Sequence, residues 1–259
     1  MKNVSILGAG WVGKALAHHL KQHHYYVKAS VQSESSFNKL DIEDKFLLNH
    51  NNNYYHQDFY ATDVLVVAIP PKDGYLTLLA EVLTHTNPKT QLILLSSTSI
   101  YQQTQGKVIE RDSHSIIENH SLMLQAEQLL QRKHPNLIIL RLGGLMGYNR
   151  IAGKYSEGTT IKQNAPVNHI HRDDVVEIIK QIIEKNIRNE VFNVVAPKHP
   201  TKKELYSRNA KQFSFLPTNF EREEVEGKIV SSKKLIEHLK YEFIYPNPCE
   251  FYMPSLAYS

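Results

Sequence analysis

Along the first half of the chain, short apolar runs alternate with segments whose apolar residues recur at helical spacing. Short apolar runs that end at Gly or Pro are typical of strands buried in a parallel sheet. The runs with this character are 4–7, 26–31, 63–69 and 91–95. Between the first two, Val12, Leu16 and Leu20 share one face of a predicted helix. Residues 45–60 are polar and rich in Asn, and they are predicted to form an irregular or shortened crossover.

The second half repeats this order of helices and strands. The pattern predicts a helix over 122–133, a strand over 137–142 and a strand over 191–195. Between the two strands, residues 175–183 carry an apolar helical face, and Asp173 or Asp174 is the expected N-cap of that helix. After Pro197 the pattern changes, and Thr201 with Glu204 forms a capping-box signature.

Together these elements predict an α/β protein with a Rossmann-type doubly wound parallel sheet and a small C-terminal α+β subdomain. The expected sheet domain covers 1–147 and 171–196. The expected subdomain, on the substrate side, covers 148–170 and 197–259.

Composition narrows the class of protein. The 259 residues are 41% hydrophobic and 22% charged, which is enough to bury a full core. A net charge of +4 without a dense Lys/Arg tract favours anionic small molecules over nucleic acid. One cysteine, Cys249, excludes an internal disulfide, and no apolar run reaches the length of a membrane span. We expect a cytoplasmic monomer or homodimer with no nucleic-acid or membrane partner.

A glycine motif follows the first predicted strand. Gly8-Ala9-Gly10-Trp11-Val12-Gly13 lies between that strand and the next helix, the setting that a dinucleotide fingerprint requires. Gly8 permits a tight turn, Gly10 lets a pyrophosphate approach the backbone, and Gly13 allows close packing of helix on strand. The amides near Trp11 and Val12 are expected to face the phosphates. The motif predicts a dinucleotide site.

The end of the second strand bears on which dinucleotide is bound. NAD-selective proteins of this fold place an acid there, which accepts hydrogen bonds from the ribose 2′-hydroxyl. Residues 28–33 contain no acid, and they offer Lys28, Ser30, Gln32 and Ser33 instead. NADP is therefore favoured over NAD, although the stretch contains no arginine to grip a 2′-phosphate.

Several further motifs make the chain resemble the extended and atypical short-chain dehydrogenase/reductases, the NAD-dependent epimerase/dehydratase-like proteins. These motifs are 95–101 (LSSTSIY), 141–147 (RLGGLMG), 167–174 (VNHIHRDD), 191–195 (VFNVV) and 227–231 (GKIVS). The resemblance spans nearly the whole chain. It implies a nicotinamide cofactor and a small-molecule substrate.

The resemblance also implies roles for individual residues. Ser97 matches the catalytic Ser/Thr, whose hydroxyl polarises the substrate carbonyl or alcohol. The segment Ala68, Ile69 and Pro70 matches the adenine side of the cofactor, and the loop containing Leu142, Gly143 and Gly144 matches the part that flanks the nicotinamide. For Ser97 and its neighbours, local backbone hydrogen bonding is the alternative interpretation.

The chain departs from the family at its Tyr-x-x-x-Lys motif. Asn119 and Met123 stand where the tyrosine and the lysine are expected, and neither can transfer the proton or lower a hydroxyl pKa. Tyr101 or His120 is a candidate replacement for the acid/base, because a phenol or imidazole can exchange a proton. A solvated helix-start residue is an equally good interpretation of His120.

Histidines elsewhere suggest no metal site. His19 and His23 share a helical face, yet no carboxylate or cysteine pattern accompanies them in the sequence, so no metal is expected. His169 and His171 either line a substrate cleft or are polar residues before a helix cap.

Three classes of function remain. The leading one is an NAD(P)-dependent oxidoreductase or epimerase/dehydratase-like enzyme that acts on a carbonyl or carbinol substrate, with sugar nucleotides among the candidates. The second is a non-catalytic NADP-binding protein in which the cofactor is sensed or structural. A scaffold without cofactor comes last, because the glycine fingerprint is intact.

Overall fold

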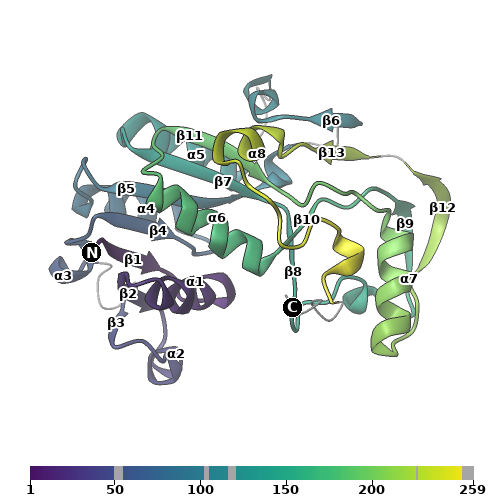
Figure 1. The fold of residues 1–259 in the computed structure, drawn as a ribbon, viewed down its shortest axis with the longest axis horizontal. Coiled ribbons are helices and arrows are strands. Elements are labelled where there is room, and N and C mark those ends of the chain that lie inside the picture. The colour runs from purple at the N-terminus through teal and green to yellow at the C-terminus, as the bar shows by residue number, and fades with distance from the viewer. Residues whose placement is uncertain (50–54, 102–104, 116–120, 226, 253–259) are drawn as a thin grey trace. The chain divides into compact units, whose positions relative to one another are not determined.

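The computed structural model describes residues 1–49, 55–101, 105–115, 121–225 and 227–252 (Figure 1). The chain divides into two compact units. Unit 1 comprises Met1–Ile100, Ile117–Arg141 and Val176–Phe192, and unit 2 comprises Tyr101–Ile116, Leu142–Val175 and Asn193–Ser259. Residues 101–116, 142–147, 171–175 and 193–196 thus belong to unit 2, whereas the sequence pattern assigned them to the sheet domain.

A seven-stranded sheet forms the centre of unit 1. Its strands are β1 (Asn3–Leu7), β2 (Tyr26–Val31), β3 (Asp44–Leu47), β4 (Val64–Val67), β5 (Gln91–Ser97), β7 (Leu137–Leu142) and β11 (Glu190–Val194). They lie in the order β11-β7-β5-β4-β1-β2-β3. Parallel pairing places Val4 opposite both Val27 and Val64. The chain order reverses between β1 and β4, and ligands of open α/β sheets bind beyond the strand ends at such a point.

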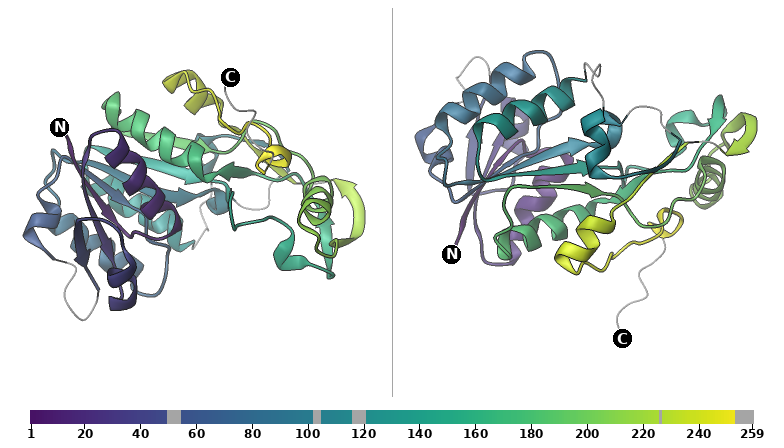
Figure 2. Two further views of the ribbon diagram at one scale, coloured as in Figure 1. Left: turned by 60° about the horizontal axis from the view of Figure 1, so that its bottom comes forward. Right: turned by 90° about the horizontal axis from the view of Figure 1, so that it is seen from above.

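Helices cover both faces of this sheet. They are α1 (Trp11–Gln22), α2 (Glu34–Lys39), α3 (Gln57–Tyr60), α4 (Tyr75–His85), α5 (Leu122–Lys133) and α6 (Arg172–Glu184), with a 3-10 turn η1 (Thr98–Ile100). Helices α4 and α5 lie on one face and α1 and α6 on the other (Figure 2). Because both faces are covered, β4 and β7 are buried at every position. This arrangement confirms the predicted doubly wound α/β fold.

One strand of unit 1 was not predicted. Residues 45–60, predicted to form an irregular or shortened crossover, include most of β3, and their helix α3 has a single turn. Phe46 and Phe59 pack edge to face at 5.4 Å between ring centroids, and this apolar contact stabilises the otherwise polar segment. The period of the sequence hid these elements because each has only four residues.

Unit 2 consists of short strands and two helices around a core of its own. Its elements are β6 (Gly106–Val108), η2 (Glu110–Ser115), β8 (Gly144–Met146), η3 (Lys154–Ser156), β9 (Thr160–Asn164), β10 (His169–His171), α7 (Lys202–Phe213), β12 (Asn219–Val225), β13 (Lys228–Val230), α8 (Lys233–Leu239) and η4 (Pro248–Glu250). The strands form three parallel pairs, β8 with β10, β9 with β12 and β6 with β13. Met146, Val167 and Phe251 are among the buried core residues.

The predicted start of α7 is confirmed. The amide of Glu204 donates to Thr201 Oγ1 at 3.1 Å, and the amide of Thr201 donates to Glu204 Oε2 at 2.7 Å. This reciprocal pair satisfies two amides that the first turn of a helix leaves without partners.

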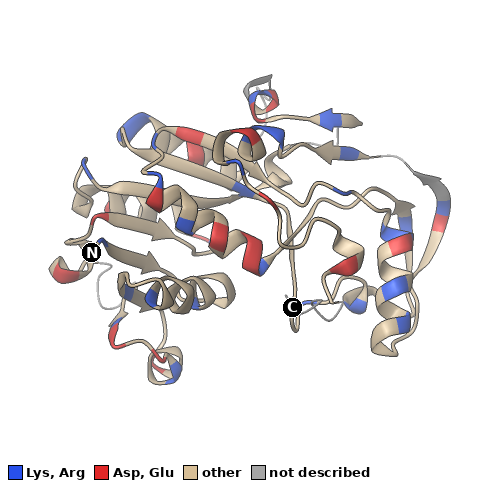
Figure 3. Ribbon diagram, viewed as in Figure 1, with Lys and Arg blue, Asp and Glu red and all other residues tan. Residues whose placement is uncertain are grey.

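Charged residues of both signs are spread over the helices of both units (Figure 3). This mixture accords with the small net charge of +4. Within the described part of the chain, no helix is both long enough and apolar enough to cross a membrane.

The N-terminus of α6 differs from its prediction. The helix begins at Arg172, so Asp173 and Asp174 lie inside its first turn and neither is the N-cap. The ring of His171 serves that purpose, because its Nδ1 accepts a hydrogen bond from the amide of Asp173 at 3.2 Å. A ring nitrogen that accepts is unprotonated, so the proton of this imidazole lies on Nε2.

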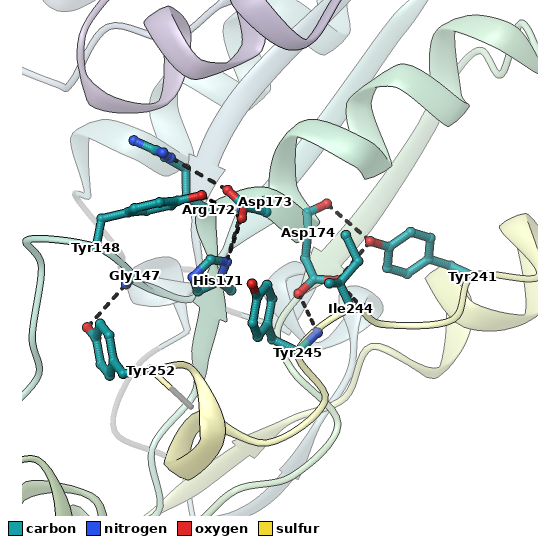
Figure 4. Close-up of polar contacts among 10 residues, drawn as sticks. All are labelled: Gly147, Tyr148, His171, Arg172, Asp173, Asp174, Tyr241, Ile244, Tyr245 and Tyr252. Carbon is teal, nitrogen blue, oxygen red and sulfur yellow. Dashed lines mark hydrogen bonds and ion pairs between the residues drawn. The ribbon is translucent and has the colours of Figure 1, made fainter. Parts of the chain in front are cut away.

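Asp174, which belongs to unit 2, instead binds a segment of the same unit that is distant in the sequence (Figure 4). Its Oδ1 accepts from the Tyr241 hydroxyl and from the Ile244 amide, each at 2.8 Å, and its Oδ2 accepts from the Tyr245 amide at 3.1 Å. The side chain is fully buried. Burial raises the pKa of Asp174 to about 6, although the three hydrogen bonds favour the charged form and oppose that shift.

The raised pKa makes the stability of these contacts depend on pH. Between the ordinary value of 3.8 and about 6 the folded chain binds more protons than the unfolded chain. The free energy of unfolding therefore falls as pH rises through this range, by on the order of 2–3 kcal/mol for this group. Asp174→Asn cannot titrate, so urea unfolding should show the wild type losing stability relative to this variant between pH 4 and pH 7.

Tyr241→Phe provides a matched comparison, because its stability relative to the wild type should change with pH in the direction opposite to that of Asp174→Asn. It removes a donor that favours the charged carboxylate, so it should destabilise the protein more at pH 7 than at pH 4. Equal pH dependence in the wild type and both variants would contradict the assignment.

Candidate functional site

The glycine turn after β1 is fixed by contacts with two neighbouring strands. Gly8 adopts a φ of +103°, a conformation that favours glycine. Its amide donates to Ser30 Oγ at 3.2 Å, and the amide of Ala9 donates to the Ser30 carbonyl at 2.7 Å. A Cβ on Gly8 would lie 2.6 Å from Ile69 Cγ2. The turn is thus held between the ends of β2 and β4.

Gly13 and Gly10 differ in what surrounds them. A Cβ on Gly13 would lie 2.1 Å from the Gly8 carbonyl oxygen, so the packing of α1 on β1 requires glycine there. Gly10 has a φ of −78°, which other residues adopt. Its two chain neighbours aside, no atom of the described residues lies within 4 Å of the place of its Cβ. Neither backbone strain nor packing explains the glycine at position 10.

The first turn of α1 has the chemistry of an anion site. It starts at Trp11 and Val12, it contains no acidic residue, and no side chain caps it at Gly10. Its amides and helix dipole therefore favour a negative group in front of the turn. A pyrophosphate over Gly10 fits this arrangement, because the missing side chain leaves the space that such a group would fill.

The segment after β4 lies beside this turn, as the resemblance implies. The Ala68 amide donates to the Leu7 carbonyl at 2.9 Å, and Ile69 is buried against Gly8. Pro70 is exposed. The structure therefore brings the glycine turn and residues 68–70 together within unit 1.

The candidate residues at the end of β2 divide into buried and exposed groups. Ser30 is buried, and its hydroxyl accepts the Gly8 amide, so it holds the turn. Gln32 and Ser33 are exposed, and Ser33 is the N-cap of α2 through a hydrogen bond from the Ser36 amide at 3.2 Å. Lys28 is buried and donates to the carbonyls of Asp58 and Ala61. The ammonium group of Lys28 is therefore used in hydrogen bonds within the fold.

Ser97 is the last residue of β5, at the same edge of the sheet as the glycine turn. Its side chain is half-buried, and its Oγ accepts a hydrogen bond from the Ser99 amide at 3.1 Å. Because the oxygen is the acceptor in that bond, the hydroxyl hydrogen can be donated elsewhere. This geometry suits a group that polarises an oxygen of a ligand.

A buried ion pair next to Ser97 was missed by sequence reasoning. Arg141 Nη2 lies 2.7 Å from Glu127 Oε2, and both side chains are almost fully buried. The hydroxyl of Ser96 donates to the same carboxylate. The sequence contains a signal for this pair, since an arginine interrupts the apolar run of β7 and Glu127 lies on the apolar face of α5.

The proposed acid/base positions are only partly described. Met123 lies one turn before Glu127 in α5 and is 5% exposed, packed as an apolar core residue. Asn119 and His120 lie outside the described residues.

In unit 2, Tyr101 is engaged in the fold. It is 3% exposed, and its hydroxyl donates to Asn193 Oδ1 at 2.7 Å. Lys228 Nζ donates to the Tyr101 carbonyl at 2.6 Å, and burial lowers the pKa of this lysine. A tyrosine and a lysine thus lie together here, but their polar atoms bind Asn193 and the backbone. This geometry favours a structural role for Tyr101.

The glycines after β7 pack against a neighbouring strand of unit 2. A Cβ on Gly143 would lie 2.4 Å from the Asn168 carbonyl oxygen, and one on Gly144 would lie 2.1 Å from His169 Nδ1. Internal packing therefore explains both glycines. Leu142 beside them is buried.

His169 and His171 are held neutral. Burial lowers the pKa of His169 to about 4, against the opposing effect of a hydrogen bond with the backbone of Asn168. His171 lies 3.9 Å from Tyr245 between ring centroids, and burial together with Arg172 lowers its pKa (Figure 4). The N-cap role favours the structural interpretation of His171.

One of the N-terminal histidines is hydrogen-bonded to an acid, and burial lowers the pKa of its imidazole, which favours the neutral ring. His19 Nε2 lies 3.0 Å from Glu177 Oε2, a partner that no nearby sequence pattern revealed. In the described ranges, no three His, Cys, Asp or Glu residues gather as a metal site would need.

Comparison with known proteins extends this picture. No family model matches the chain. Protein YeeZ of Escherichia coli (strain K12) is 28% identical over 270 residues, which cover 96% of this chain and 98% of YeeZ.

Two solved structures share the fold. A putative NAD-dependent epimerase/dehydratase from Methylobacillus flagellatus superimposes with a TM-score of 0.80 at 22% identity, over 97% of this chain and 96% of that one. The human epimerase family protein SDR39U1 with NADPH gives a TM-score of 0.68 at 15% identity, over 96% of this chain and 97% of that one. The chain therefore shares the fold of these two epimerase-type structures.

Proposed function

We propose that the chain binds a nicotinamide dinucleotide at the turn from Gly8 to Gly13. The observation that carries this proposal is the contrast between the glycines. Contacts within the chain account for Gly8 and Gly13, whereas the open space at Gly10 has no internal cause. A pyrophosphate there accepts hydrogen bonds from the first amides of α1. The NADPH bound to the human structure supports the same class of ligand.

The other proposed cofactor contacts have different support. Ala68, Ile69 and Pro70 lie beside the turn and are proposed to line the adenine side. The role of Leu142, Gly143 and Gly144 beside the nicotinamide rests on the resemblance alone. When bound, the nicotinamide supplies hydride transfer to or from a substrate carbon.

NADP is the proposed form of the cofactor. Support comes from the end of β2, where exposed Gln32 and Ser33 present an amide and a hydroxyl without a carboxylate. Two observations limit the preference. Lys28 is committed to the fold, and Glu34 lies in the first turn of α2, where its negative charge opposes a 2′-phosphate. We expect a small difference in affinity.

The proposed activity is that of an oxidoreductase or epimerase/dehydratase-like enzyme acting on a carbonyl or carbinol compound, with sugar nucleotides among the candidates. Ser97 is the proposed group that orients the substrate oxygen. One observation favours a second candidate, a non-catalytic NADP-binding protein. Met123 is packed in the core where the family has its lysine, so the chain lacks the cation that lowers the pKa of a catalytic tyrosine.

Gly10→Val tests cofactor binding. The new side chain occupies the space proposed for the pyrophosphate, so calorimetry should show NADP affinity reduced by at least about tenfold. The free energy of unfolding should fall by no more than about 2 kcal/mol, the typical effect of an unfavourable N-cap residue, because φ at this position suits other residues.

Gly13→Ala is the matched comparison. Its Cβ would meet the Gly8 carbonyl oxygen, so it should lower the free energy of unfolding by about 1–3 kcal/mol. Unchanged NADP affinity in Gly10→Val would contradict the proposed site.

Gln32→Glu tests the choice of cofactor. It restores an acid at the end of β2, which repels a 2′-phosphate and accepts from a ribose hydroxyl. The ratio of NADP to NAD affinity should fall about tenfold, measured at fixed ionic strength. Asn38→Glu adds the same charge farther along α2 and should leave the ratio unchanged. A wild-type protein that binds NAD as tightly as NADP would refute the preference.

Turnover of ordinary alcohols and ketones should be weak or absent. A positioned proton donor contributes roughly 10²- to 10⁴-fold, and the usual one is missing. If steady-state assays detect turnover, Ser97→Ala should reduce it at least about tenfold while NADP affinity stays within about twofold. Ser99→Ala removes a neighbouring exposed hydroxyl and serves as the control.

Two further variants locate the proton donor of any turnover. His120→Gln lowers the rate only if His120 supplies the proton. Tyr101→Phe also removes the hydrogen bond to Asn193, so a lower rate identifies Tyr101 as the donor only if NADP affinity and the free energy of unfolding are unchanged. A rate that is indifferent to Ser97→Ala would show that Ser97 has no part in the chemistry.

A further inference from the structure

Unit 2 contains a cavity of about 610 Å³ that the proposed function does not use. One wall is formed by residues 107–111, from β6 into η2, and the other by residues 231–238, which lead into α8. All lining residues belong to unit 2, whereas the glycine turn belongs to unit 1. Its volume is typical of sites for small molecules.

The two walls are fixed to one another by Asn193. This residue is fully buried, and its amide donates to Glu110 Oε1 at 2.8 Å while its Nδ2 donates to the Ser231 carbonyl at 3.2 Å. Its Oδ1 accepts the hydroxyl of Tyr101. Glu110 and Ser231 are lining residues of opposite walls, so the backbone amide and the side chain of one buried residue together connect the two walls.

Strand pairing adds a second connection between the walls. β6 and β13 pair in parallel with Lys107 opposite Ile229, and the Ser231 amide donates to the Val108 carbonyl at 2.8 Å. The cavity is thus preformed, and a ligand would not have to order its walls.

Cations outnumber acids around the cavity. Four basic side chains line it, namely Lys107, Arg111, Lys233 and Lys234. The acids are Glu110 and Glu237. Blue and red segments meet where β6, β13 and α8 lie together in Figure 3.

The two acids are already engaged. Glu110 accepts the buried Asn193 amide, and Glu237 lies 3.5 Å from Lys233 in an exposed pair. Neither Lys107 nor Arg111 takes part in an ion pair within the described ranges. The cavity therefore presents two uncompensated cations on its β6–η2 wall, beside the lysines of α8.

We infer that this cavity binds a small phosphorylated molecule through a group with at least two negative charges. A phosphate or pyrophosphate matches a cluster of cations in a concave site, and the guanidinium of Arg111 can donate two parallel hydrogen bonds to it. The concave shape limits the ligand to a small molecule, since a nucleic-acid backbone is bound along a stripe of cations.

Inorganic pyrophosphate is the probe, titrated by calorimetry at low ionic strength into the full chain that carries Gly10→Val. That substitution removes the proposed dinucleotide site, so failure of one proposal is distinguishable from failure of the other. Binding of one pyrophosphate per chain, weakened by added salt, is the expected result. Absence of binding at millimolar pyrophosphate overturns the inference.

Variants of exposed residues locate the site. Arg111→Gln and Lys107→Gln should each weaken pyrophosphate binding about five- to tenfold. Arg132→Gln removes an exposed arginine of α5 outside the cavity and should have no effect. Glu237→Gln removes an acid and should strengthen binding.

The remaining outcomes are equally decisive. Equal weakening by Arg132→Gln would mean that the chain attracts anions through its net charge alone, and this would overturn the site. Binding of citrate as tight as that of pyrophosphate would overturn the assignment to a phosphate group.

Discussion

The contact between Gly13 and the carbonyl oxygen of Gly8 is the constraint on which the candidate site depends. A Cβ at position 13 would lie 2.1 Å from that oxygen, so α1 can start directly behind β1 only with glycine there. This close approach directs the first amides of α1 beyond the carboxyl end of β1, at the point where the strand order reverses. The φ of Gly8 and its hydrogen bond to Ser30 complete the turn.

Once that turn is set, the parallel sheet determines which other residues share its edge. The end of β4 lies against Gly8, and Ser97 ends β5, the next strand along. The buried pair of Glu127 and Arg141 holds α5 to β7, and Ser96 joins it from β5. The removal of either charge would leave the other buried without a partner, which is costly. The buried ion pair and Ser96 thus support the edge of the sheet that carries Ser97.

The sequence predicted the regular elements well where their patterns were long. The strand over 26–31, the helix over 122–133 and the strand over 137–142 have the predicted ends, because each carries an apolar run or stripe bounded by clear breaks. The glycine turn was predictable because its spacing reflects local geometry. By contrast, β3 and α3 are too short to show a period.

Sequence patterns did not predict the roles of residues whose partners are distant in the chain. Asp174 was expected to cap its own helix, but it binds the backbone of Ile244, 70 residues away. Ser30 is predicted to contact the cofactor, and the sequence did not reveal that its buried hydroxyl also accepts the amide of Gly8. Tyr101 was a candidate acid, and its hydroxyl is used by Asn193, 92 residues away. Such pairings follow from topology, and no local pattern encodes them.

The single tryptophan of the chain permits a direct test of the central claim. Trp11 follows Gly10 and begins α1, so it adjoins the proposed pyrophosphate position. We predict saturable energy transfer from excited Trp11 to the reduced nicotinamide of NADPH, reversed by an excess of NADP. Fluorescence of Trp11 that is unaffected by saturating NADPH would contradict the account.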